Sequence, residues 1–139
     1  MQRGQPKYRA AQVLRWLYEK RVTSFAGMSD LPAALRADLA EAFTFLRLET
    51  LRTLGSEDTT RKYLFKLPDG ALIESVLIPA SPALYGEASD RRTLCVSTQV
   101  GCAYGCKFCA SGLDGFSRNL SPGEIAGQLI EAEIGRAHV

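Results

Sequence analysis

The spacing of hydrophobic residues predicts two helices in the first third of the chain. Between residues 7 and 21 the hydrophobic side chains recur at helical intervals, and Trp16 lies beside the face that they form. Residues 30–32 predict the start of a second helix, because Pro32 suits the first helical turn. The apolar positions are Ala10, Val13, Leu14, Leu17 and Tyr18 in the first helix and Leu35, Leu39, Ala42, Phe43 and Leu46 in the second. We expect residues 1–46 to form a small helical domain.

The pattern changes from helical to alternating after residue 46. Residues 47–54 alternate loosely and residues 60–67 alternate clearly, which predicts strands. Residues 68–70 read Pro-Asp-Gly and predict a tight turn, and residues 71–78 then predict a returning strand. One face of the first strand of this β-hairpin carries Tyr63, Phe65 and Leu67. We therefore expect an α+β arrangement in which a hairpin and linker, residues 47–90, follow the helical domain.

Glu74 is an acidic residue inside the second strand of this hairpin. Period-two geometry places it on the same face as Leu72, Val76 and Ile78. Such an acid is commonly a surface or edge residue. The alternative is a partly buried carboxylate, whose pKa would be raised by desolvation and which would suit proton transfer.

The last third of the chain predicts a strand, a cysteine-rich loop and a helix. Residues 79–92 predict a loop that separates this part, residues 91–139, from the hairpin. Residues 93–98 predict a short buried strand that carries Cys95. Ser121 and Glu124 have the spacing of a capping box and predict the start of the helix. Its apolar positions are Ile125, Leu129 and Ile134, and residues 135–139 continue the helical pattern poorly.

The order strand, loop, helix is that of the first unit of a β/α barrel. In such barrels the chemistry takes place at the C-terminal ends of the strands, where the cysteine-rich loop would lie. Only one such unit is present.

Three cysteines in eight residues predict a metal site. Cys102, Cys106 and Cys109 have the spacing C-x3-C-x2-C, with Phe108 directly before the third cysteine. A structural zinc site would need a fourth ligand from Cys95 or His138. A [4Fe–4S] cluster held by three cysteines would keep one iron open for a small molecule. The ligand count favours the iron–sulfur cluster.

The charge distribution and composition bear on contact with phosphate groups and on the cellular compartment. The chain has 139 residues and a net charge of +2, but residues 1–21 hold six basic groups and one acid. This segment predicts either a phosphate-facing surface or a solvated helix face. The candidates for phosphate contact are Lys7, Arg9, Arg15 and Arg36. Nothing resembles a signal peptide or a membrane span, so we expect a cytoplasmic protein with reduced thiols rather than a disulfide framework.

These residues carry a resemblance to a known family. The pattern C-x3-C-x-aromatic-C is similar to the signature of radical S-adenosylmethionine (SAM) enzymes. The flanking residues 92–102 and 115–120 resemble the RlmN family, the dual-specificity methyltransferases that modify C2 of adenine in 23S rRNA and tRNA. Residues 6–13 and 31–36 are similar to the helical accessory domain of that family. The resemblance implies the start of a partial β/α barrel and a helical domain that binds RNA.

The resemblance also implies a role for individual residues. Cys102, Cys106 and Cys109 would ligate a [4Fe–4S] cluster whose open iron binds SAM, and Phe108 would pack beside the cluster or the SAM adenine. Electron transfer would yield a 5′-deoxyadenosyl radical, which acts on a methyl group carried by a cysteine. Glu74 would accept a proton, and Cys95 would release the RNA adduct through a transient disulfide. The further implications are an electron donor such as flavodoxin, a monomer and no membrane partner.

The chain departs from the family pattern in its second half. No cysteine follows Cys109 to carry a methyl group, and the Gly-Glu-Pro segment associated with SAM is absent. We therefore expect an N-terminal fragment that does not methylate RNA by itself. Two alternatives are a relative that methylates adenine C8 and confers antibiotic resistance, and a non-enzymatic zinc-dependent RNA-binding module.

Overall fold

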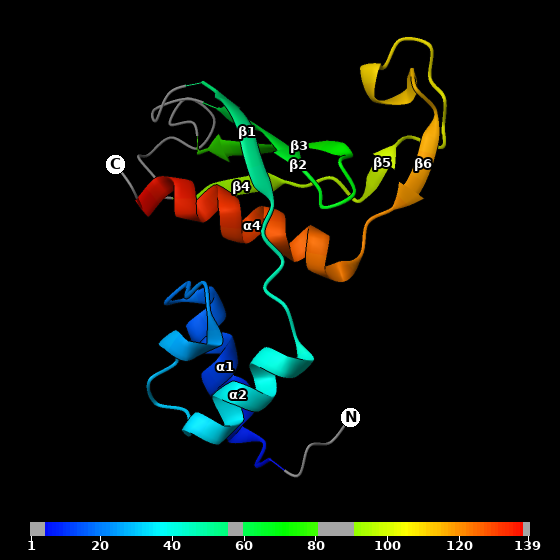
Figure 1. Cartoon of the computed structure of the whole chain (residues 1–139). Coiled ribbons are helices and arrows are strands. Elements are labelled where there is room, and N and C mark those ends of the chain that lie inside the picture. The colour runs from blue at the N-terminus through cyan, green and yellow to red at the C-terminus, as the bar shows by residue number, and fades with distance from the viewer. Residues whose placement is uncertain (1–4, 56–59, 81–90, 138–139) are drawn as a thin grey trace. The chain divides into compact units, whose positions relative to one another are not determined.

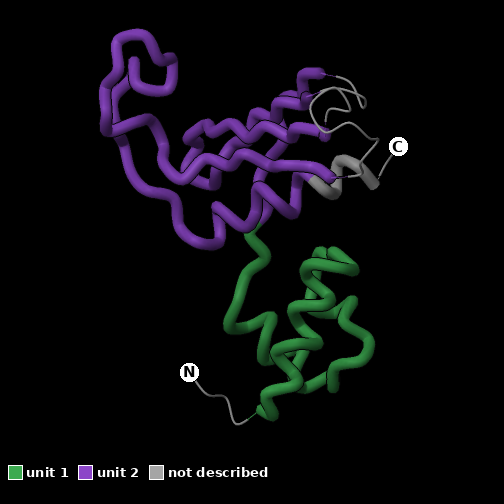
Figure 2. The backbone as a smooth tube through the Cα atoms, turned by 180° about the vertical axis from the view of Figure 1, so that it is seen from behind, with its two compact units in different colours: residues 1–46 green, residues 47–139 purple. Residues whose placement is uncertain are grey.

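The chain divides into two compact units, residues 1–46 and residues 47–139 (Figure 2). The computed structural model describes residues 5–55, 60–80 and 91–137. The first unit is helical, and the described part of the second combines strands with a long C-terminal helix (Figure 1). This confirms the α+β class. No helix among these residues is long and apolar enough to cross a membrane.

The first unit is built around Trp16, which the spacing had placed beside the apolar face. Its helices are α1 (Tyr8–Tyr18), η1 (Phe25–Gly27) and α2 (Ala33–Ala42). The buried cluster consists of Trp16, Met28, Leu31 and Leu35. The indole nitrogen of Trp16 donates a hydrogen bond to the Asp30 carboxylate, so its only polar atom is satisfied while the ring is buried. Two residues predicted for the apolar face, Leu14 and Tyr18, are instead exposed.

The second predicted helix ends earlier than its apolar pattern. It ends at Ala42, and Phe43 is already extended. The extended chain lets Phe45 pack its ring 4.5 Å from that of Phe25. A tertiary contact between aromatic rings therefore replaces the last helical turn that Leu46 had suggested.

The second unit contains a four-stranded antiparallel sheet in the order β1-β2-β3-β4. Its strands are β1 (Glu49–Leu54), β2 (Arg61–Lys66), β3 (Leu72–Pro79) and β4 (Arg92–Cys95). The predicted hairpin is confirmed as β2 and β3. In its turn Gly70 has φ +87°, and the Asp69 carboxylate accepts a hydrogen bond from the Ala71 amide.

One face of this sheet is buried and the other is open. Tyr63, Phe65 and Leu67, which the alternation placed on one face, are buried there together with Ile73 and Leu77. Helix α4 (Pro122–Ala137) lies along this face (Figure 1). The opposite face carries the exposed residues Leu72, Glu74 and Ile78.

The strand predicted over residues 93–98 is wrong in extent and in burial. Strand β4 ends at Cys95, and the Cys95 side chain is exposed. Among the described strands β4 pairs only with β3, so it is an edge of the sheet rather than a covered barrel strand. The chain then forms a separate two-stranded sheet, β5 (Gln99–Gly101) and β6 (Phe116–Asn119), that the hydrophobic pattern did not predict. The loop of residues 81–90, which includes most of the expected domain boundary, lies outside the described residues.

Helix α4 packs with polar side chains, which corrects the prediction for Leu129, whereas Ile125 is half-buried. Leu129 is 42% exposed, whereas Gln128 is fully buried. The capping box is confirmed, because the Ser121 amide donates to the Glu124 carboxylate and the Glu124 amide donates to the Ser121 hydroxyl. The helix also continues to Ala137, although residues 135–137 fit the helical pattern poorly. The buried residues of this face are Glu124, Gln128, Glu131 and Ala132.

Candidate functional site

The cysteine loop joins β5 to β6 and is closed at its base by a main-chain hydrogen bond. The Cys102 amide donates to the Gly115 carbonyl at 3.0 Å. The strands approach closely here: Gly101 has φ +73°, and a β-carbon on it would lie 1.9 Å from the Gly115 oxygen. Only glycine fits at this position, so the first cysteine directly follows a conformationally specialised residue.

The three predicted cluster ligands lie in this loop as free, partly exposed thiols. Cys109 precedes the short helix η2 (Ala110–Gly112), and its amide donates to the Cys106 carbonyl at 3.1 Å. The donor set fits an iron–sulfur cluster, because three thiols on one loop are unpaired and reachable from solvent. Within the described part of the chain, however, no three metal-ligating side chains are gathered as a metal-binding group. Their convergence on a cluster therefore stays a prediction.

The same loop exposes large apolar side chains. Phe108, the residue expected beside the cluster or SAM, is 93% exposed, and Tyr104 is 90% exposed. Leu113 is 70% exposed. The loop therefore offers apolar contact area next to its thiols, and the role of Phe108 stays a prediction.

Glu74 and Cys95 lie on the same open face of the sheet. The strand register pairs Val76 with Cys95, and Glu74 is two residues before Val76, so the two site candidates are diagonal neighbours. The Lys62 ammonium forms an ion pair with the Glu74 carboxylate at 2.7 Å, and both side chains are about half exposed. Of the two interpretations of Glu74, the structure supports the exposed carboxylate. The sequence pattern did not predict that Cys95 would be a neighbour of Glu74.

A cleft of about 510 Å³ connects Glu74 with the cysteine loop. Its walls come from the open sheet face, from the segment before β5 and from the end of the cysteine loop. The lining of the cleft includes Glu74, Ser97, Gly101, Ala110 and Asp114. Gly101 and Ala110 are the direct neighbours of Cys102 and Cys109. A molecule in this cleft would therefore lie between the Glu74 carboxylate and the cysteine loop.

Gln128, which the hydrophobic pattern did not single out, contacts Ser97 in the wall of the cleft. Its carboxamide oxygen accepts hydrogen bonds from the Ser75 hydroxyl at 2.7 Å and the Ser97 amide at 2.8 Å. Its nitrogen donates to the Ser97 carbonyl at 2.9 Å and to the Glu124 carbonyl at 3.2 Å. The polar residues at positions 124, 128 and 131 recur at helical spacing, and this pattern could have indicated Gln128 from the sequence.

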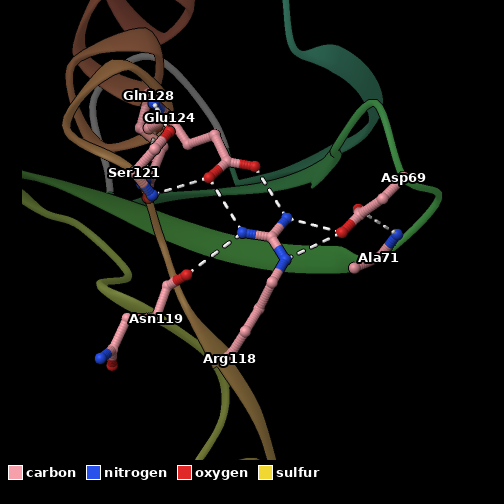
Figure 3. A network of polar contacts seen from close by, with 7 residues as sticks. All are labelled: Asp69, Ala71, Arg118, Asn119, Ser121, Glu124 and Gln128. Atoms are coloured by element: carbon pink, nitrogen blue, oxygen red, sulfur yellow. Dashed lines mark hydrogen bonds and ion pairs between the residues drawn. The ribbon is translucent and has the colours of Figure 1, made fainter.

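Arg118 forms the second polar connection at the base of the site (Figure 3). Its guanidinium donates to the Asp69 carboxylate at 2.6 Å and to the Glu124 carboxylate at 2.8 Å. The hydrogen bond from Arg118, and then that from the Ser121 amide, lowers the pKa of Glu124 from 4.5 to about 2. The pKa of Asp69 is lowered by the Ala71 amide and then by Arg118. Arg118 thus joins the β2–β3 turn, β6 and the start of α4.

The basic residues of the first unit differ in what they contact. Arg36 donates to the Ala26 carbonyl at 2.7 Å, and Arg9 donates to the Gln12 side chain at 2.7 Å. Arg15 is exposed and lies 3.5 Å from Glu19, and Lys7 is also exposed. Lys7 and Arg15 are therefore better placed than Arg36 for contact with phosphate.

Comparison with known proteins shows which family the chain is similar to. The family model described as ribosomal RNA large subunit methyltransferase N-terminal domain matches residues 1–45. A probable dual-specificity RNA methyltransferase RlmN from Akkermansia muciniphila is 58% identical over 130 residues, which is 94% of this chain and 36% of the relative. Over most of its length, therefore, the chain is similar to RlmN proteins. The RlmN protein of Syntrophotalea carbinolica is 50% identical over 93% of the chain and 33% of its own length.

A solved structure agrees with this assignment. A radical SAM methyltransferase from Sphaerobacter thermophilus matches with a TM-score of 0.75 and 41% sequence identity, over 97% of this chain and 38% of that protein. The chain thus spans about a third of the length of the RlmN relatives that it matches.

The depressed pKa of Glu124 predicts an acid-sensitive second unit. A carboxylate of this kind stabilises the fold fully above its unfolded pKa of 4.5, and the contribution is lost as the pH falls towards about 2. We expect the urea-unfolding free energy of residues 47–139 to decrease over this interval, and Glu124→Gln to make the decrease shallower. Glu41→Gln, an exposed position in the other unit, should leave the slope of the second unit unchanged. If the unfolding free energy of wild type and of Glu124→Gln depended on pH equally, this would contradict a lowered pKa of Glu124 in the folded chain.

Proposed function

We propose that the chain is part of a radical SAM enzyme that methylates C2 of adenine in 23S rRNA and tRNA. The single observation that carries this proposal is the free C-x3-C-x2-C loop beside a cleft that also contains Glu74. Its position in a chain similar to RlmN proteins supports methylation of RNA over a purely structural metal site. The same similarity favours the C2 alternative over the C8 alternative.

In this proposal the loop holds the cofactors. Cys102, Cys106 and Cys109 ligate the [4Fe–4S] cluster, and Phe108 contributes apolar contact beside it. When bound, the cluster and SAM supply an electron and a carbon radical, and an external donor such as flavodoxin replaces the electron. Strand β4, the loop and α4 form the first β/α unit of a partial barrel. Reduced thiols of this kind suit the cytoplasm.

The open sheet face supplies the proton acceptor and the second reactive thiol. The Glu74 carboxylate takes the proton that leaves adenine C2 after the new carbon–carbon bond has formed. Cys95 would then form a transient disulfide with the sulfur of the methyl-carrying cysteine. This breaks the bond between that sulfur and the carbon now attached to the RNA, and the carbon takes up a proton to become the methyl group. The diagonal placement of Glu74 and Cys95 on β3 and β4 supports joint action on one base. Lys62 holds the Glu74 side chain by its ion pair.

The helical unit would bind the RNA backbone. Lys7 and Arg15 are exposed basic residues of this unit, which the family model of an N-terminal methyltransferase domain matches. Ionic contacts to phosphate release counterions from the RNA, so this binding should depend strongly on salt.

The cluster proposal predicts the behaviour of four single-cysteine variants. After anaerobic reconstitution with iron and sulfide, the wild-type chain should be brown with a broad band at about 400 nm. Cys102→Ser, Cys106→Ser and Cys109→Ser should each lose most of this band, because each removes one of three thiolate ligands. Cys95→Ser is the matched control and should keep it. A colourless wild-type chain with stoichiometric zinc would instead support the zinc-dependent RNA-binding module.

The RNA proposal predicts a salt-dependent affinity for tRNA. Lys7→Gln and Arg15→Gln should each weaken binding and reduce the slope of log K against log salt by about one. Lys20→Gln removes an equal charge, but its ammonium lies 4.0 Å from the Trp16 ring, so we expect a smaller change. Equal effects of all three variants, or binding that does not depend on salt, would contradict phosphate contact by Lys7 and Arg15.

A further inference from the structure

The fully buried side chain of Gln128 uses all of its hydrogen-bonding capacity. The carboxamide oxygen accepts two hydrogen bonds and the nitrogen donates two. Two of the four hydrogen bonds go to the main chain of one residue, Ser97. Gln128 therefore holds both the amide and the carbonyl of Ser97, as a residue of a neighbouring strand would in a β-sheet.

Ser97 is the point where the proposed site residues meet. It lies two residues after Cys95 and five residues before Cys102. Its hydroxyl donates a hydrogen bond to the Glu74 carbonyl at 2.7 Å. Ser97 is thus held by α4 through its main chain and holds β3 through its side chain, next to the cleft that it lines.

The helix has other attachments on both sides of Gln128. One turn earlier, Glu124 is paired with Arg118 at 2.8 Å, and one turn later Glu131 is paired with Arg47 at 2.8 Å. These two ion pairs tie α4 to the rest of the unit without contacting Ser97. Loss of the Gln128 carboxamide should consequently loosen the segment around Ser97 more than the docking of the helix.

We propose that Gln128 is a positioning residue of the site. It holds Ser97 in place and thereby fixes the relative positions of Glu74, Cys95 and the start of the cysteine loop. This role deepens the proposed function and rests on it for its purpose, since Glu74 and Cys95 must face the same base. A buried polar network of this kind specifies one arrangement where an apolar side chain would allow several.

The test uses the metal-free chain and two local reporters. The Leu120 amide donates to the Thr98 carbonyl at 2.8 Å, so its hydrogen exchange reports the position of the residue after Ser97. The carbonyl carbon shift of Glu74 reports the hydrogen bond from Ser97, and Ser97→Ala gives its value when that bond is lost. The Phe65 amide in the β2–β3 hairpin reports the stability of the sheet.

In Gln128→Met the Leu120 amide should exchange at least about tenfold faster, as loss of a buried hydrogen bond implies. The Glu74 carbonyl shift should move towards its value in Ser97→Ala, while the Phe65 amide stays protected. Ser75→Ala is the matched control, because it removes one hydrogen bond of Gln128 but leaves both bonds to Ser97. It should leave both local reporters at their wild-type values.

Three results would overturn the proposal. They are an unchanged Glu74 shift in folded Gln128→Met, equal effects of Ser75→Ala, and equal acceleration of the Leu120 and Phe65 amides. If Gln128→Met unfolds the unit, Gln128→Glu keeps the two accepted hydrogen bonds and loses the donated ones, and it should shift the same reporters. Unfolding of both variants would make Gln128 a general packing residue and would also refute the proposal. None of these readouts needs a cluster or methyl transfer, so a failure of the proposed function would be recognised separately.

Discussion

The polar face of α4 is the constraint on which the second unit depends. A helix usually packs on a sheet with apolar residues, but among its described side chains α4 buries Glu124, Gln128 and Glu131 beside Ala132. Each has a partner outside the helix: Arg118, six residues before Glu124, and the more distant Ser97 and Arg47 for Gln128 and Glu131. Because a buried charge or amide without a partner is costly, this face can dock in only one register. The helix thereby fixes where the chain passes from the sheet into the cysteine loop.

The candidate site depends on two arrangements. The pairing of β3 with β4 brings the exposed residues Glu74 and Cys95 together on the open face. Helix α4, through Gln128, holds Ser97 in the wall of the cleft that Glu74 and the cysteine loop also line. The groups that would do chemistry are exposed, whereas the groups that place them are buried. The buried groups that stabilise the unit and the exposed candidate groups therefore lie on opposite faces of one sheet.

The sequence predicted those features that depend on neighbouring residues. The β2–β3 hairpin and the capping box at Ser121 follow from local turn and cap chemistry, and both are confirmed. The resemblance carried by the cysteine motif and its flanks identified the RlmN family, which the comparisons support.

Features that depend on distant partners could not be predicted in this way. The central place of Trp16 depends on Asp30, and the end of α2 depends on the contact between Phe25 and Phe45. The inward face of α4 was predicted wrongly, because hydrophobic spacing assigns buried positions to Leu129 and not to a glutamine whose partners lie far along the chain. The β5–β6 hairpin was missed because its strands are short and carry few apolar residues.

The proposed function depends on a cluster that three thiolates of the cysteine loop would hold, with one iron left open to SAM. The most direct measurement is the electron paramagnetic resonance spectrum of the reconstituted, reduced chain before and after addition of SAM. An open iron predicts that SAM changes the spectrum of the wild-type chain and of Cys95→Ser alike, since Cys95 is not a ligand. A reconstituted cluster whose spectrum does not respond to SAM, or whose response requires Cys95, would contradict the claim.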